Sequence, residues 1–112
     1  MAIPLSDVDP VAAREMLERS TAILIDVREN DEWAAGHAPG AAHVPLADLD
    51  PAVYTDGLPL IVVCRTGRRS SKAAAQLASA GLAVHNMAGG MTAWHRAGNS
   101  VVRDGGIIGT VI

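Results

Sequence analysis

The stretch that decides the fold covers residues 60–71 and reads Leu60-Ile61-Val62-Val63-Cys64-Arg65-Thr66-Gly67-Arg68-Arg69-Ser70-Ser71. Its apolar first part is typical of a strand buried on both faces, as in a parallel sheet. A glycine-containing loop over 65–69 follows, and an alanine-rich helix is expected over 70–80. In open α/β sheets ligands bind beyond the carboxyl ends of the strands, which is where Cys64 falls. The stretch therefore predicts an α/β fold and also the place of a site within it.

The rest of the chain continues the alternation of strands and short helices. A helix is expected to begin at Asp9-Pro10 and to fade near Ser20, because aspartate caps free amides and proline fits the first helical position. A buried strand is expected over 22–27, a short helix over 29–36 and a brief strand within 37–44. A further strand over 83–87 and a short helix over 92–97 complete the pattern. This order indicates one α/β domain with a parallel sheet.

Composition restricts the class of protein. A length of 112 residues is typical of one ordinary domain. The composition, with 49% hydrophobic and 19% charged residues, excludes an intrinsically disordered chain. A net charge of −3 and only 3% aromatic residues argue against a nucleic-acid partner. With one cysteine and four histidines outside zincin spacing, we expect neither a metal nor a cofactor. No window approaches a membrane span, and no signal peptide is seen, so we expect no membrane partner. A free thiol then favours a cytoplasmic location.

The residues after Cys64 favour a reactive thiol. The loop amides and the first helical amides can converge into an anion-binding concavity, and Gly67 permits the dihedral angles that this needs. Four of the nine basic residues lie within eight positions here, namely Arg65, Arg68, Arg69 and Lys72. Amides and guanidinium groups both favour the thiolate. We therefore expect a nucleophilic Cys64 in a pocket for a small anion, although a lone cysteine at a strand end is more often a buried hydrophobe.

Three motifs resemble the signatures of single-domain rhodaneses, which are sulfurtransferases. They are the loop Cys64-Arg65-Thr66-Gly67-Arg68-Arg69-Ser70, the upstream group Asp26-Val27-Arg28-Glu29, Glu32-Trp33 and Gly36-His37-Ala38-Pro39-Gly40-Ala41, and the stretch Asn86-Met87-Ala88-Gly89-Gly90-Met91-Thr92-Ala93-Trp94. The resemblance implies one rhodanese-like domain over residues 1–112, with a core of about 6–98 and a C-terminal tail of 99–112. It also implies a five-stranded parallel sheet flanked by helices on both faces.

The resemblance further implies a mechanism. The thiolate of Cys64 would attack the outer sulfur of a small anionic donor such as thiosulfate, and the resulting persulfide would pass its sulfur to cyanide, a thiol or a partner protein. The donor would be held by the loop residues Arg65, Thr66, Gly67, Arg68, Arg69 and Ser70. Arg65 and Arg69 are the expected side-chain contributors, whereas Arg68 is expected to face solvent. Asp26 and Arg28 are expected to form an ion pair that supports the loop.

Two alternatives stay open at this point. One is a non-catalytic rhodanese-like binding or regulatory module. The other is a related phosphatase or arsenate reductase, although Arg69 comes one position earlier than the arginine of classical cysteine phosphatases.

Two further expectations concern packing. Trp33 and Trp94 are expected to anchor the core. The apolar tail is expected either to pack back on the domain or to form a contact patch.

Overall fold

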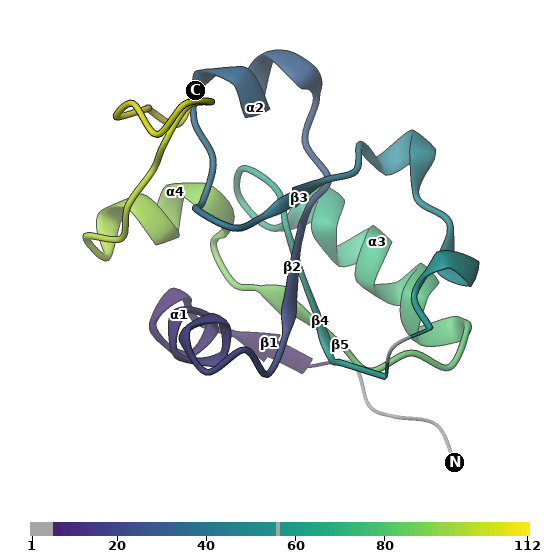
Figure 1. Cartoon of the computed structure of the whole chain (residues 1–112). Coiled ribbons are helices and arrows are strands. Elements are labelled where there is room, and N and C mark those ends of the chain that lie inside the picture. Colours follow the sequence, from purple (N-terminus) through teal and green to yellow (C-terminus); the bar gives the residue numbers. More distant parts are fainter. Residues whose placement is uncertain (1–5, 56) are drawn as a thin grey trace.

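Five parallel strands form the centre of the molecule (Figure 1). The computed structural model describes residues 6–55 and 57–112. The strands are β1 (Ser6–Val8), β2 (Ile23–Asp26), β3 (Ala42–His43), β4 (Leu60–Val63) and β5 (Val84–Met87). Their order in the sheet is β1-β5-β4-β2-β3, so β4 occupies the middle position. The predicted five-stranded parallel sheet is confirmed, and the strand before Cys64 is its central strand.

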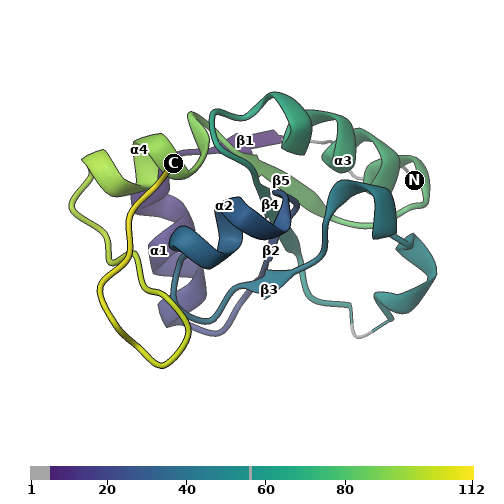
Figure 2. The ribbon, with the colours of Figure 1, turned by 90° about the horizontal axis from the view of Figure 1, so that it is seen from above.

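Helices cover both faces of this sheet, as expected. The helices are α1 (Pro10–Glu18), α2 (Asn30–Ala35), α3 (Arg68–Ser79) and α4 (Gly90–Arg96). Figures 1 and 2 show α1 and α4 on one side of the sheet and α3 on the other. Two short 3-10 turns, Leu46–Asp48 and Pro51–Val53, precede β4. The Asp9 side chain accepts the amide of Ala12 and caps α1, as the sequence predicted.

The core forms on both faces of β4, whose four residues are fully buried. On one face Met91 and Trp94 of α4 pack with Ala13 of α1. On the other face Ala73 and Leu77 of α3 pack against the sheet. A strand with buried side chains on both faces has no polar side to expose, which explains its continuous apolar sequence.

The expectations for Trp33 and for the start of α3 were wrong, and one strand was not predicted. Helix α3 begins at Arg68 rather than at residue 70, because Gly67 adopts a left-handed φ of 107° and starts the helix there. Strand β1 was not predicted from its pattern, since it is short and mostly exposed and is defined by its pairing with β5. Trp33 is only partly buried and does not anchor the core. Its ring stacks instead on His37, with centroids 3.6 Å apart, and on His43, with centroids 4.7 Å apart.

The C-terminal tail packs back on the domain and also leaves an exposed apolar tip. Val101 is 6% exposed within the core, and the Thr110 amide donates to the carbonyl of Ala35 at the end of α2. The segment doubles back through a bridge between Val102 and Ile108, and Ile108 is 87% exposed. Over the described residues, no helix combines the length and apolar character needed to cross a membrane.

Candidate active site

Cys64 lies directly after β4, at the carboxyl edge of the central strand. The strand pairs with β2 on one side and with β5 on the other, so the segments that follow these strands surround the cysteine. The residue is only 1% exposed. The surroundings of its sulfur are therefore a few protein groups rather than bulk water.

Two hydrogen-bond donors reach the sulfur. The backbone N–H of Gly67 lies 3.1 Å from Sγ, and the hydroxyl oxygen of Ser70 lies 3.3 Å from it. Burial raises the pKa of the Cys64 thiol, but these two donors, together with the nearby amides of Ser70 and Thr66, lower it by more. The net result is a pKa below the ordinary value for cysteine. The loop and the first turn of α3 thus favour the thiolate, as the sequence suggested for the amides.

The basic residues near Cys64 do not all point toward its sulfur: one is paired with a carboxylate and two are exposed. Both terminal nitrogens of Arg69 donate hydrogen bonds to the carboxylate of Glu32 in α2, at 2.6 and 2.8 Å. Hydrogen bonding to Arg69 holds the pKa of Glu32 below its usual range, and the same bonds raise the pKa of Arg69. Arg65 and Arg68 are exposed, and neither forms an ion pair with any described residue. Hydrogen-bond donors at the sulfur therefore lower the pKa of Cys64, and Arg69, whose charge also interacts with the thiolate, is itself paired with Glu32.

Asp26 and Arg28 form a fully buried ion pair at the end of β2. The guanidinium donates to both carboxylate oxygens at 2.8 to 3.0 Å, and one terminal nitrogen also donates to the carbonyl of Gly36 at 2.7 Å. Nε2 of His43 in β3 donates to the carbonyl of Arg28. The pair thus joins β2 to the end of α2, the helix whose Glu32 holds Arg69.

Sequence reasoning missed Asn86 as a member of the site. This β5 residue is 7% exposed, and its Oδ1 lies 2.6 Å from the Ser70 hydroxyl. Its Nδ2 donates to the carbonyl of Gly67 at 3.4 Å. The sequence signals were a polar residue inside a buried strand, which generally needs a partner, and its place at the start of the third motif.

The start of α4 also belongs to the site. The amides of Met91 and Thr92 donate to the carbonyls of Cys64 and Arg65, at 2.8 and 3.0 Å. A Cβ at Gly90 would lie 2.5 Å from both of these carbonyl oxygens. Gly90 therefore lets the helix approach the backbone of the loop, whereas a Cβ at Gly89 would meet the side chain of Ala93. The adjacent glycines between a strand and a helix were the signal in the sequence.

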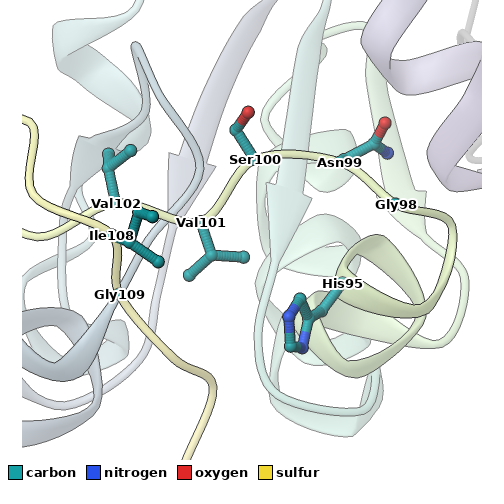
Figure 3. Close-up of a pocket in the computed structure, with 8 residues that line it drawn as sticks. All are labelled: His95, Gly98, Asn99, Ser100, Val101, Val102, Ile108 and Gly109. Carbon is teal, nitrogen blue, oxygen red and sulfur yellow. The ribbon is translucent and has the colours of Figure 1, made fainter.

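A surface cavity of about 310 Å³ lies away from Cys64, between α4 and the C-terminal tail. Figure 3 shows its rim, which runs along the tail from Gly98 to Val102, and His95 on α4. His95 is the only titratable residue among those that line it, so it offers little for catalysis. Among residues 6–55 and 57–112, no cluster of three or more histidine, cysteine or acidic side chains could hold a metal ion.

Comparison with known proteins identifies the family of this chain. The family model described as "Rhodanese-like domain" matches residues 9–97. The chain therefore belongs to the rhodanese-like domain family, as its motifs predicted.

Particular relatives carry more specific names. The chain is 37% identical over 89 residues to the thiosulfate sulfurtransferase GlpE of Pseudomonas fluorescens, covering 76% of this chain and 81% of that protein. It is 32% identical to the putative sulfurtransferase YtwF of Bacillus subtilis, covering 80% and 90% of the two chains. It also spans 55% of the uncharacterized protein slr1261 of Synechocystis, at 31% identity and 86% coverage of this chain. A rhodanese-related protein from Thermoplasma volcanium has the same fold, with a TM-score of 0.80, 24% identity, and coverage of 87% and 97%.

Proposed function

We propose that this protein is a sulfurtransferase that carries sulfur as a persulfide on Cys64. One observation carries the proposal: the Cys64 sulfur accepts a backbone amide and a hydroxyl at the end of the central strand, and its pKa is lowered. A thiolate is the nucleophilic form of cysteine. The sulfurtransferase names of two relatives support this reaction class.

The transfer proceeds in two displacements. The Cys64 thiolate attacks the outer sulfur of thiosulfate, the sulfur–sulfur bond of the donor breaks, and its electron pair leaves with sulfite. Cys64 then carries a persulfide whose negative charge lies on the outer sulfur. Cyanide, a thiol or a partner protein attacks that outer sulfur, and the thiolate of Cys64 is regenerated. No second cysteine is needed for this cycle.

The loop contributes binding and charge stabilisation. The donor and the persulfide are both anions, so the amides of residues 65–70 can stabilise them by hydrogen bonds. Arg65 in the loop and Arg68 at the start of α3 are exposed and can attract the anionic donor. Because Cys64 is 1% exposed, the site favours a donor that presents one narrow sulfur atom. The lone thiol suits a reducing compartment, and we propose the cytoplasm.

Intact-mass measurement tests the proposal directly. The reduced protein is treated briefly with thiosulfate, weighed, and weighed again after cyanide is added. We expect the gain of one sulfur atom and its loss on cyanide addition, and neither change in Cys64→Ser. A folded, reduced protein that gains no sulfur would refute the proposal. Hydrolysis of an aryl phosphate would then favour the phosphatase alternative, and inactivity in both assays would favour a binding module.

A further inference from the structure

The hydroxyl of Ser70 faces two acceptors but has one proton to donate. Its oxygen lies 2.6 Å from Oδ1 of Asn86 and 3.3 Å from Sγ of Cys64. All three residues are buried, at 0%, 7% and 1% exposure for Ser70, Asn86 and Cys64. Water therefore does not relieve the competition. A distance of 2.6 Å lies at the short end for a hydroxyl donor, which places the proton toward Asn86 while the sulfur is uncharged.

The amide of Asn86 is held in one orientation. Its Nδ2 donates to the carbonyl of Gly67, which also accepts the amide of Ser71 in the first turn of α3. Turning the amide over would bring Oδ1 against that carbonyl, so two acceptors would face each other. Asn86 therefore keeps its oxygen toward Ser70 as a fixed acceptor.

We propose that Asn86 is a positioning residue, which holds the Ser70 proton while the Cys64 sulfur is uncharged and gives it up when that sulfur becomes a thiolate. This inference rests on the proposed function, since sulfur transfer changes the charge on Sγ in each cycle. Both acceptors surround the same Ser70 oxygen. The exchange is therefore a rotation about the Cβ–Oγ bond of Ser70 and requires no movement of heavy atoms.

The exchange follows the two displacements. In the persulfide, Sγ is an uncharged bridging atom, and the Ser70 hydroxyl donates to Asn86. When the acceptor attacks the outer sulfur, the bond between the two sulfurs breaks and its electron pair stays on Sγ. A hydrogen bond to an ion is stronger than one to a neutral amide, so the hydroxyl turns to the sulfur. Ser70 thus stabilises the leaving thiolate as it forms, while Asn86 limits that stabilisation and so preserves the nucleophilicity of the thiolate.

Other charges near the sulfur stay constant in the test. Arg69 on α3 is close enough for its pKa to be raised in part by the Cys64 thiolate, and Glu32 on α2 pairs with it. The exposed Arg65 belongs to the loop itself. The substitutions described next leave all three residues in place.

The experiment is the pH profile of Cys64 alkylation by iodoacetamide. The chain has no other cysteine, so the rate reports this thiol alone. Wild type is compared with Ser70→Ala, Asn86→Leu and the double variant, each checked for folding by circular dichroism. We expect Ser70→Ala to raise the midpoint by about one pH unit, the size of one hydrogen bond to a charged group. Asn86→Leu should lower the midpoint, because the hydroxyl is then free for the sulfur. The double variant should have the same midpoint as Ser70→Ala alone, because the Asn86 substitution acts only through the Ser70 hydroxyl.

Two results would overturn the inference. If Asn86→Leu raises the midpoint as Ser70→Ala does, Asn86 merely orients Ser70 toward the sulfur. If the effect of Asn86→Leu persists without the Ser70 hydroxyl, it does not act through that proton. Should Asn86→Leu fail to fold, Asn86→Ala removes the same acceptor and carries the same expectation. Alkylation needs no sulfur transfer, so these outcomes are independent of the mass experiment that tests the proposed function.

Discussion

Gly90 offers a sharp test of how the active loop is held. It is the first residue of α4, with a φ of 62°, and a Cβ there would lie 2.5 Å from the carbonyl oxygens of Cys64 and Arg65. Both contacts are with backbone, which cannot rotate away as a side chain can. Gly90→Ala must therefore move the helix away from the loop or distort the loop itself.

The expected loss can be assembled from separate effects. The left-handed conformation costs a residue with a Cβ about 1–2 kcal/mol. Overpacking costs about 1–3 kcal/mol. Separating the helix from the loop also weakens the bonds from Met91 and Thr92, each worth about 0.5–1.5 kcal/mol. We therefore expect Gly90→Ala to lower the free energy of unfolding by about 3 kcal/mol or more.

Gly81→Ala is the matched control. Gly81 lies just beyond the end of α3, with a φ of 88°, and its Cβ would meet nothing within 4 Å. It carries the conformational cost of about 1–2 kcal/mol without the contact. Both substitutions affect the unfolded chain alike. Urea denaturation of the two variants therefore isolates the steric effect, and the alkylation rate of Cys64 should change only in Gly90→Ala. Equal losses of stability in the two variants would refute the reasoning.

Three further predictions concern other parts of the structure. Asp26→Asn leaves the buried Arg28 guanidinium without its counter-charge, so urea unfolding should show a loss of about 3–5 kcal/mol; a loss near zero would contradict a stabilising pair. The pKa of Glu32 is lowered in the folded state, so its pairing with Arg69 stabilises at neutral pH and is lost as the pH falls through that lowered pKa. Because the pair is partly exposed, Glu32→Gln should lower the free energy of unfolding by at most about 1 kcal/mol at neutral pH. The difference from wild type should vanish in acid, and a difference that does not change with pH would contradict the role of the pairing. Ile108→Ser should change stability by no more than about 0.5 kcal/mol, since Ile108 is 87% exposed; a larger loss in thermal unfolding would show that the tip is packed.

The sequence predicted the elements whose patterns are local. The apolar run before Cys64 is buried on both faces, and Asp9 caps the first helix, because burial and capping both follow from neighbouring residues. Strand β1 escaped prediction because only its pairing with β5 defines it. Trp33 was misplaced for a similar reason: its stacking on His43 depends on how β3 returns beside α2, which no local pattern records.

The sequence predicted where the candidate site lies in the fold, but not which side chains pair with one another in it. The position of Cys64 after a buried strand was readable, since it depends on chain order alone. The pairing of Arg69 with Glu32 joins residues 37 positions apart, and it uses a guanidinium that the sequence assigned to the anion. Asn86 lies 16 positions from Ser70 and comes from the neighbouring strand. Contacts of this kind depend on strand order, which residue patterns could not supply, and the resemblance implied only the number and direction of the strands.

The backbone of the loop is arranged so that its carbonyls and amides face different partners. The carbonyls of Cys64 and Arg65 are taken by the start of α4, and that of Gly67 by Ser71 and Asn86. With its oxygens bound from outside, the loop presents amides to the sulfur, and the Gly67 amide reaches Sγ at 3.1 Å. Such a fixed array of donors stabilises an anion without reorganising during the reaction. Gly90, the first residue of α4, thus contributes to the chemistry of Cys64 from the far side of the loop, because it lets the helix come close enough to bind the loop carbonyls.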